Sequence, residues 1–222
     1  MTWIKICGIT NLEDALMAAN AGADALGFVF YEKSPRRVNL DTARTIVAEL
    51  PKKVEKVGVF VDGGHSEEVA GQVGLTAIQL HVDSQSPQPT PEAKSSSPLK
   101  RYIALPVRWF LEEGNEFTDR MLGWHGFKPN AIFLDSSTPH QPGGTGTVFD
   151  WEKAAPLVAA MSAAVNIVVA GGLTPTNVAE AIRILKPSGV DVASGVEARP
   201  GKKDPEKVRA FIAAVRQTEK NA

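Results

Sequence analysis

Cysteine, long apolar segments and an excess of charge of either sign are all scarce in this sequence. The single cysteine, Cys7, cannot form a disulfide within the chain, and no apolar run approaches the roughly 18 residues of a membrane-spanning helix. The 24 lysines and arginines nearly balance the 25 aspartates and glutamates, which argues against a basic groove for nucleic acid. The first residues turn acidic at Glu13 and Asp14, too early for a secretory signal. We therefore expect a cytoplasmic protein that binds neither nucleic acid nor membrane.

Motifs for metals and nucleotides are missing as well. The four histidines, His65, His81, His125 and His140, show no paired ligand spacing, and no second cysteine could complete a metal site. No Walker loop occurs, and the segment Gly144–Phe149 lacks the last glycine of a dinucleotide-binding turn. The sequence therefore predicts an activity that needs neither a metal nor a cofactor.

Short β-branched runs alternate with segments of helical period along nearly all of the 222 residues. About eight such units can be counted, which is the number that closes a parallel barrel. The pattern predicts an α/β fold, a single (βα)8 TIM barrel in one domain spanning residues 1–222. The expected strands are Trp3–Cys7, Ala23–Phe30, Val57–Val61, Ala77–Leu80, Tyr102–Val107, Ala131–Leu134, Ile167–Ala170 and Val190–Ala193. The expected helices include one from the cap Asn11 to Gly22, Leu40–Leu50, one capped by Ser66, and Pro205 to about Val215.

One stretch, Ser84–Pro98, breaks this alternation because it contains four prolines and a run of serines. Proline removes backbone donors and serine competes for the backbone, so the fourth helix is expected to be weak or irregular. A domain linker is the alternative. Against it, neither flank carries a complete set of units for a fold of its own.

Reacting groups in such a barrel sit where strands end, which draws attention to Cys7 and Asp135. Side chains alternate along a strand, so if Ile4 and Ile6 face the helices, Lys5 and Cys7 face the barrel axis. The same logic turns Asp135 inward, and the two strands then offer a thiol and a carboxyl to one opening. The plain alternatives are a small buried hydrophobic residue for Cys7 and a helix cap for Asp135.

The state of the thiol depends on its neighbours, because a useful base needs a group that favours the thiolate. Lys5 lies two residues earlier on the same face and could supply that charge. Asp191, on the strand that closes against the first one, could instead pair with Lys5. Our hypothesis is that Lys5 is internally paired and alters Cys7 only modestly.

Glycine-rich turns follow three expected strands, at Gly143–Gly146, at Gly171 and Gly172, and at Ser194 and Gly195. The last two turns occupy the loops where barrels of this kind often bind phosphate through backbone N–H groups. We also expect His81 to line the opening, because it follows the fourth strand. Arg36, in the loop after the second strand, is either a solvated charge or a ligand for a substrate carboxylate.

Blocks of residues spanning nearly the whole chain resemble the phosphoribosylanthranilate isomerase family of tryptophan biosynthesis. They include Lys5–Thr10, Gly27–Phe30, Ser34–Arg36, Gly58–Phe60, Gln79–His81, Leu134–Asp135, Gly143–Gly146, Phe149–Trp151, Ala170–Leu173 and Ser194–Glu197. Departures lie mostly between Val82 and Phe117: Val82 stands where the family usually has glycine, and the Pro- and Ser-rich stretch replaces a more regular helix.

The resemblance implies a cofactor-free isomerase acting on an anionic, phosphorylated aminosugar. It implies the Amadori rearrangement of N-(5-phosphoribosyl)anthranilate to 1-(2-carboxyphenylamino)-1-deoxyribulose 5-phosphate, with Asp135 as general acid and Cys7 as general base. It further implies that Arg36 contacts the anthranilate carboxylate. The binding residues carried over from the family and the turns are His81, Gly144, Gly171, Gly172, Ser194 and Gly195.

Two other functions remain open from the residues alone. Another sugar-phosphate isomerase or epimerase would use an aspartate at the end of the first strand or clustered metal ligands, and neither pattern is found in the sequence. A barrel that binds phosphorylated ligands without turning them over is the non-enzyme alternative, since a fold by itself does not fix function. The sequence leaves open whether the protein is a monomer or a homodimer.

Overall fold

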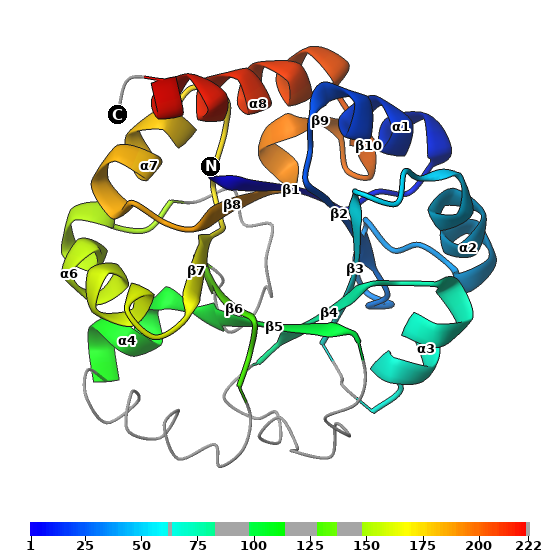
Figure 1. Cartoon of the computed structure of the whole chain (residues 1–222), viewed down its shortest axis with the longest axis horizontal. Helices are drawn as coiled ribbons and strands as arrows, with labels where there is room; N and C mark the ends of the chain where they lie inside the picture. Colours follow the sequence, from blue (N-terminus) through cyan, green and yellow to red (C-terminus); the bar gives the residue numbers. More distant parts are fainter. Residues whose placement is uncertain (62–63, 83–97, 114–127, 137–147, 221–222) are drawn as a thin grey trace.

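The computed structural model describes residues 1–61, 64–82, 98–113, 128–136 and 148–220. Eight parallel strands form a closed barrel in chain order, and β1 pairs with β8 to complete the ring (Figure 1). The strands are β1 (Trp3–Cys7), β2 (Ala25–Val29), β3 (Glu55–Phe60), β4 (Ala77–His81), β5 (Lys100–Pro106), β6 (Ala131–Asp135), β7 (Asn166–Val169) and β8 (Gly189–Val192). The predicted (βα)8 barrel is confirmed, with strand ends shifted by a few residues.

Helices surround the barrel on its outside (Figure 1). Within the described residues they are α1 (Leu12–Ala21), α2 (Leu40–Glu49), α3 (Ser66–Val73), α4 (Val107–Glu113), α6 (Trp151–Ser162), α7 (Val178–Leu185) and α8 (Pro205–Lys220). After β8 the chain forms a 3-10 turn, η1 (Ser194–Val196), and then a small antiparallel hairpin of β9 (Glu197–Arg199) and β10 (Lys202–Lys203). This hairpin lies next to α1 and leads into α8 (Figure 1).

Local sequence signals account for several helix ends. The Asn11 side chain accepts a hydrogen bond from the Asp14 N–H at 2.9 Å, and α1 ends at Gly22, whose φ of 104° suits glycine. The expected cap at Ser66 is wrong: Ser66 is the first helical residue of α3, and His65 occupies the cap position without a side-chain bond. α8 runs past the expected Val215 to Lys220, and Arg216 in this extension forms an ion pair with Asp24 and donates to the Thr2 carbonyl.

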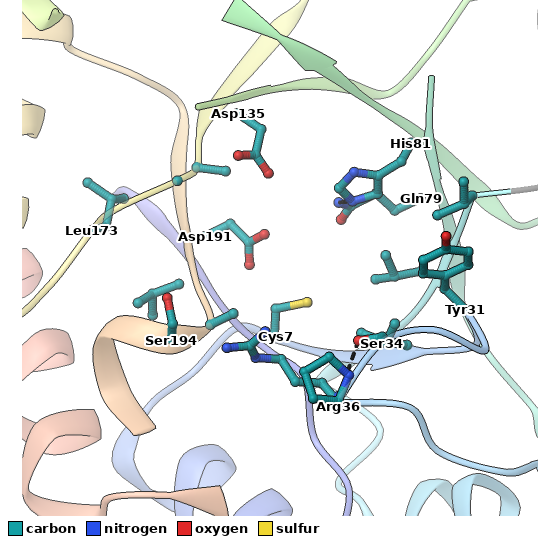
Figure 2. A pocket seen from close by; sticks show the side chains of 18 of the residues that line it. Cys7, Tyr31, Ser34, Arg36, Gln79, His81, Asp135, Leu173, Asp191 and Ser194 are labelled. Carbon is teal, nitrogen blue, oxygen red and sulfur yellow. Dashed lines mark hydrogen bonds between the residues drawn. The ribbon is translucent and has the colours of Figure 1, made fainter. Parts of the chain in front are cut away.

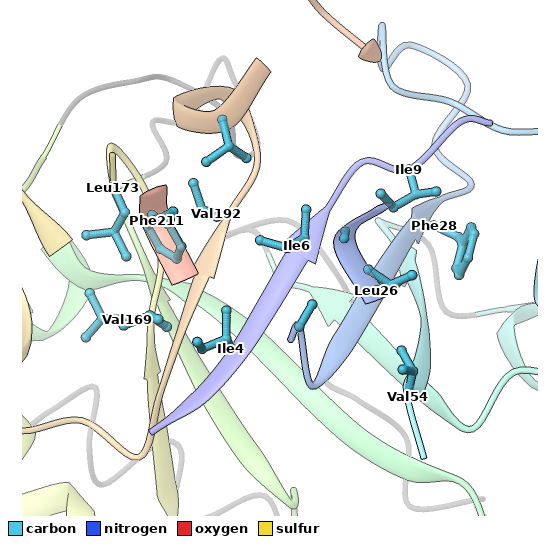
Figure 3. Close-up of a cluster of buried hydrophobic side chains, with 14 of the residues drawn as sticks. Ile4, Ile6, Ile9, Leu26, Phe28, Val54, Val169, Leu173, Val192 and Phe211 are labelled. Carbon is cyan, nitrogen blue, oxygen red and sulfur yellow. The ribbon is translucent and has the colours of Figure 1, made fainter. Parts of the chain in front are cut away.

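Two apolar layers hold the barrel. The outer layer lies between strands and helices and includes Ile4 and Ile6, both fully buried, beside Phe211 of α8 (Figure 3). The inner layer fills the barrel axis. It comprises Ala25, Val57, Ala77, Tyr102, Ala104, Ala131, Phe133 and Val168, with Trp3 packed against it. The alternation expected for the first and sixth strands is confirmed, because outward and inward residues fall into separate layers.

Two expectations fall outside the described residues. Residues 83–97 cover most of the Ser84–Pro98 stretch where the irregular fourth helix was expected, and residues 137–147 cover the Gly143–Gly146 turn. The strands on either side of residues 83–97, β4 and β5, pair directly, with Ala77 opposite Lys100. In the part of the chain that the structure describes, no helix is long and apolar enough to cross a membrane.

Candidate active site

A cavity of about 340 Å³ opens at the carboxyl ends of the barrel strands. Its walls come from the ends of β1, β4, β6 and β8 and from the loops that follow β2, β7 and β8 (Figure 2). Seven of the residues expected in the site line it: Cys7, Arg36, His81, Asp135, Gly171, Gly172 and Ser194. The tertiary structure therefore brings together side chains and turns that are up to 187 positions apart between Cys7 and Ser194.

Cys7 and Asp135 reach this cavity from different walls of the barrel. Cys7 ends β1 and Asp135 ends β6, and both side chains point into the same opening in Figure 2. Both residues are buried, with exposed fractions of 8% and 7%. A thiol and a carboxyl thus face one space that a small molecule could occupy, which is the arrangement that paired proton transfer requires.

A buried ion pair lies next to the thiol, and its carboxylate, that of Asp191, also lines the cavity (Figure 2). The Nζ of Lys5 is 3.0 Å from each carboxylate oxygen of Asp191, and the Lys5 side chain is fully buried. The hypothesis that Lys5 is internally paired is confirmed. Burial is the largest single effect and favours the neutral amine, but Asp191 and Cys7 together outweigh it and raise the pKa of Lys5.

The thiol itself is held in its protonated form. Burial raises the pKa of Cys7, and the positive charge of Lys5 offsets only part of this effect because Asp191 opposes it. A paired lysine therefore does not by itself convert the thiol into a thiolate.

His81 and Gln79 form a polar pair on β4. The Gln79 Nε2 lies 3.2 Å from the His81 Nε2, and both side chains reach the cavity wall. Burial, aided by the nearby positive charge of Lys5, lowers the pKa of His81 to about 4. The imidazole is therefore neutral at neutral pH and accepts the hydrogen bond from the amide of Gln79.

The turn after β7 has the backbone shape that suits an anion. Gly171 and Gly172 have φ values of 82° and 65°, so the chain adopts the left-handed region at two successive positions. Asn177 organises this turn, since its amide donates to the Gly172 carbonyl at 3.0 Å and its oxygen accepts from the Thr174 N–H at 2.7 Å. Successive glycines held this way can point N–H groups at a phosphate.

The turn after β8 packs against this first turn. Ser194 lines the cavity, and Gly195 is not among its lining residues. A Cβ on Gly195 would come within 1.8 Å of the Leu173 carbonyl oxygen. Gly195 is thus required for the close approach of the two turns. Gly144, the remaining glycine expected in the site, lies outside the described residues.

Arg36 bends over the cavity from the loop after β2. Its side chain is 14% exposed, and its guanidinium forms an ion pair with Glu197 at 2.8 Å. Of the two alternatives for this residue, a solvated surface charge is wrong, because the side chain is largely covered and is paired at the opening.

The comparisons with known proteins agree with one another. Residues 4–214 match the family model described as N-(5'phosphoribosyl)anthranilate (PRA) isomerase. The chain belongs to this family. An N-(5'-phosphoribosyl)anthranilate isomerase of Geobacter sp. (strain M21) is 45% identical over 219 residues, covering 98% of this chain and 99% of the relative. The phosphoribosyl anthranilate isomerase of Thermotoga maritima is 39% identical with a TM-score of 0.79, covering 98% of this chain and all of that one.

Another solved member of the phosphoribosylanthranilate isomerase family contains a ligand. It is a complex with reduced 1-(o-carboxyphenylamino)-1-deoxyribulose 5-phosphate, and it is 38% identical to this chain with a TM-score of 0.78, covering 98% of this chain and all of that one. The resemblance expected from the sequence blocks is confirmed. The chain is therefore a member of an isomerase family with the barrel fold of its relatives.

Sequence reasoning did not single out Gln79, which lines the cavity, or Asn177 and Glu197, which form hydrogen bonds to residues that line it. Gln79 could have been found, because it lies two positions before His81 and so shares its face of the strand. Asn177 and Glu197 gave no such signal. Asn177 bonds to the turn after β7, and Glu197 lies on the β9–β10 hairpin. Neither element has the apolar period from which the faces of strands or helices are predicted.

Proposed function

We propose that this protein catalyses the Amadori rearrangement of N-(5'-phosphoribosyl)anthranilate in tryptophan biosynthesis, with Asp135 as general acid and Cys7 as general base. The observation that carries the proposal is that a thiol and a carboxyl from different strands line one cavity. Family membership supports the substrate, and the reduced ligand in the solved relative has the carbon skeleton of the expected product.

The first step opens the sugar ring. Asp135 donates a proton to the furanose ring oxygen while the lone pair of the glycosidic nitrogen forms a C=N bond and the C1'–O bond breaks. The product of this step is a protonated Schiff base. Asp135 is well placed for this role because it is buried beside the apolar layer under the cavity, where it is removed from bulk water.

The second step moves a proton from carbon. Cys7 takes the proton on C2', the electrons of that bond form C1'=C2', and the C=N electrons return to nitrogen as the enolamine. The enolamine then tautomerises to the ketose. Burial raises the pKa of Cys7, so the thiol must first release its own proton to solvent, and the positive Schiff base formed nearby favours the resulting thiolate.

The two ends of the substrate carry negative groups that the cavity can hold. The fork of Arg36 suits the anthranilate carboxylate, and backbone N–H groups at Gly171, Gly172, Ser194 and Gly195 suit the phosphate. His81, which is neutral and lines the same cavity, can contact the sugar. Fixing both ends of the substrate holds the reacting carbons between the acid and the base. Binding then supplies much of the translational and rotational entropy that the reaction would otherwise cost.

We also propose that the chain acts as one domain. The pairing of β4 with β5 across the undescribed residues 83–97 places both flanks in the same barrel, which favours one domain over a linker. The Thermotoga maritima relative is described as dimeric in one solved structure. For this chain, a homodimer and a monomer both remain compatible with the proposal.

The test follows the fluorescence of the anthranilate group during turnover by the wild type, Cys7→Ser and Asp135→Asn. Each variant is expected to lose turnover by a factor on the order of 10² to 10⁴, since each removes one proton transfer. Both should still bind the reduced product analogue, measured by calorimetry, because the anchoring residues are untouched.

The same assay separates the alternatives. Full activity of Cys7→Ser would remove the base assignment, and full activity of Asp135→Asn would remove the acid. Binding of the reduced analogue by a wild type without turnover would indicate a non-catalytic barrel. Activity that requires an added metal would favour an epimerase.

A further inference from the structure

We propose that Glu197 and Lys203, neither of which faces the cavity, are positioning residues that orient Arg36 and keep a net positive charge beside it for a ligand carboxylate. This inference rests on the proposed function, because that function supplies the carboxylate. It adds two residues to the site and explains how a buried, already paired arginine can still bind an anion.

Glu197 is the centre of a buried hydrogen-bond cluster. Its Oε1 accepts from the Nε of Arg36 at 3.0 Å, from the Gly201 N–H at 3.2 Å and from the Nζ of Lys203 at 3.1 Å. Its Oε2 accepts from the Nη2 of Arg36 at 2.8 Å. The side chain is only 4% exposed. A carboxylate with four donors in fixed places has little freedom to rotate, so it can hold the guanidinium in one orientation.

Pairing along the Nε edge leaves the other edge of Arg36 available. Glu197 uses the Nε and one N–H of Nη2, and within the described residues no further side-chain bond of the guanidinium is found. The Nη1 and the second N–H of Nη2 form a fork of the shape that binds a carboxylate through two parallel hydrogen bonds. Arg36 lines the cavity, which lets a ligand reach this fork (Figure 2).

The stem of Arg36 is fixed from its other side. Gly8 follows Cys7 with a φ of 78°, and a Cβ there would come within 2.7 Å of the Arg36 Cδ. The arginine thus packs onto bare backbone beside the thiol. Both the aliphatic part and the guanidinium of Arg36 are held in place, so binding a ligand costs little side-chain entropy.

Lys203 makes the net charge of the cluster positive. An arginine and a glutamate alone would be neutral and would attract a further carboxylate only weakly, but Lys203 adds a second cation. Its side chain is fully buried, and its Nζ also donates to the Ala193 carbonyl at 3.1 Å. One net positive charge therefore remains next to the opening, in surroundings where water screens it poorly.

Burial and charge act in opposite directions on the two partners. Burial by itself would raise the pKa of Glu197, but the hydrogen bonds from Arg36 and the charge of Lys203 outweigh it and lower the pKa. Burial lowers the pKa of Lys203, and the Glu197 carboxylate opposes that shift. Glu197 is therefore a firm anion, and it stabilises the ammonium form of the lysine.

The test compares two ligands that differ only in the carboxylate. One is reduced 1-(o-carboxyphenylamino)-1-deoxyribulose 5-phosphate, and the other is the same reduced compound made with aniline, without the carboxyl group. The ratio of their dissociation constants, measured by calorimetry, is the carboxylate preference. We expect the wild type to show a preference of about 100-fold, as two charge-assisted hydrogen bonds would produce.

The variants Glu197→Gln and Lys203→Met are each expected to reduce this preference about tenfold. Affinity for the ligand without the carboxyl group should change by less than about threefold, which a general structural defect would not allow. Lys202→Met is the matched control, because Lys202 is the adjacent lysine and pairs with Glu13 and Asp14 of α1 instead of with Glu197. Its preference should equal that of the wild type.

Arg36→Met completes a double-mutant cycle. It should abolish the preference, and adding Glu197→Gln or Lys203→Met to it should change nothing further. If a single variant does not fold, the double variant Glu197→Gln with Lys203→Met serves instead, because it removes one anion and one cation together and leaves Arg36 as the only charge of the cluster. The double variant keeps the net charge of the cluster, but the guanidinium of Arg36 is no longer oriented by Glu197. We therefore still expect the carboxylate preference to fall about tenfold.

The results separate failure of this inference from failure of the proposed function. A wild type with no carboxylate preference, or an Arg36→Met variant that keeps it, would contradict the substrate arrangement itself. Loss of the preference in Arg36→Met, with the wild-type preference retained in Glu197→Gln, Lys203→Met and their double variant, would overturn the positioning role alone. Equal weakening of both ligands by either single variant would make that residue merely structural.

Discussion

Two buried charge clusters lie at the cavity, and they are balanced differently. Next to the thiol, Lys5 meets Asp191 as one cation with one anion. Beside the opening, Arg36 and Lys203 share the single carboxylate of Glu197. The opposite charges of Lys5 and Asp191 partly cancel at the thiol, so burial is the largest cause of the raised pKa of Cys7. An unbalanced cluster keeps a charge for a ligand. Lysine and carboxylate side chains thus form a cluster of zero net charge next to the thiol and, with an arginine, a cluster of net positive charge at the opening. The ratio of cations to anions makes the difference.

Breaking the balanced pair should have the largest effect. Asp191→Asn leaves the fully buried ammonium of Lys5 without its carboxylate, and we expect the free energy of unfolding to fall by about 3–5 kcal/mol. Urea denaturation monitored by circular dichroism measures the change. The control is Asp41→Asn on α2, whose partner Arg44 is half exposed, and where less than about 1 kcal/mol is expected. Similar losses in both variants would show that burial of the Lys5 pair does not matter.

His81 reports on the same cluster through pH, because the charge of Lys5 helps to lower its pKa to about 4. Between pH 6.5 and pH 4 the unfolded chain binds more protons at this residue than the folded protein. The stabilisation is therefore complete above pH 6.5 and is lost as the pH falls toward 4. The shift corresponds to about 3 kcal/mol. We expect His81→Asn to remove this pH dependence from urea unfolding curves.

The matched control for this pH effect is His65→Asn, since His65 is an exposed residue before α3. That variant should keep the pH dependence of the wild type over the same interval. A wild-type free energy of unfolding that stays level between pH 6.5 and 4.5 would contradict the lowered pKa of His81.

The smallest effect should come from removing the balanced pair as a whole. Lys5→Met alone should raise the pKa of Cys7 further, and Asp191→Asn alone should lower it, because each leaves one charge near the thiol. The double variant should shift the pKa by less than about one unit. The pH dependence of alkylation reports on this residue specifically, since Cys7 is the only cysteine. A double variant that moves the pKa as far as either single variant would show that the pair is not balanced at the thiol.

Much of the fold and half of the site could be predicted from short-range patterns. The period of two along Trp3–Cys7 placed Lys5 and Cys7 inward, and the same rule turned Asp135 into the barrel. Strand ends were predictable to within a few residues because apolar runs end where the chain leaves the core. The cap at Ser66 was wrong, since a serine before a helical segment does not by itself show which residue begins the helix.

The Glu197 cluster could not be predicted in this way. Arg36 and Glu197 are 161 positions apart, and Glu197 lies on a hairpin whose strands have three and two residues. Such short, charged strands show no period, and ion pairs between distant residues leave no local pattern. The raised pKa of Cys7 also required the structure, because burial rather than the adjacent lysine is its largest cause.

By itself, the order of apolar and polar residues determined that eight strands close into a barrel and which side chains face its axis, because both follow from local periodicity and the need to bury apolar surface. The same periodicity, with closure of the last strand on the first, also suggested the Lys5–Asp191 pair. Only the tertiary structure decided that Arg36 meets Glu197 across a hairpin, because electrostatic energy depends on distances and burial that no run of neighbouring residues contains.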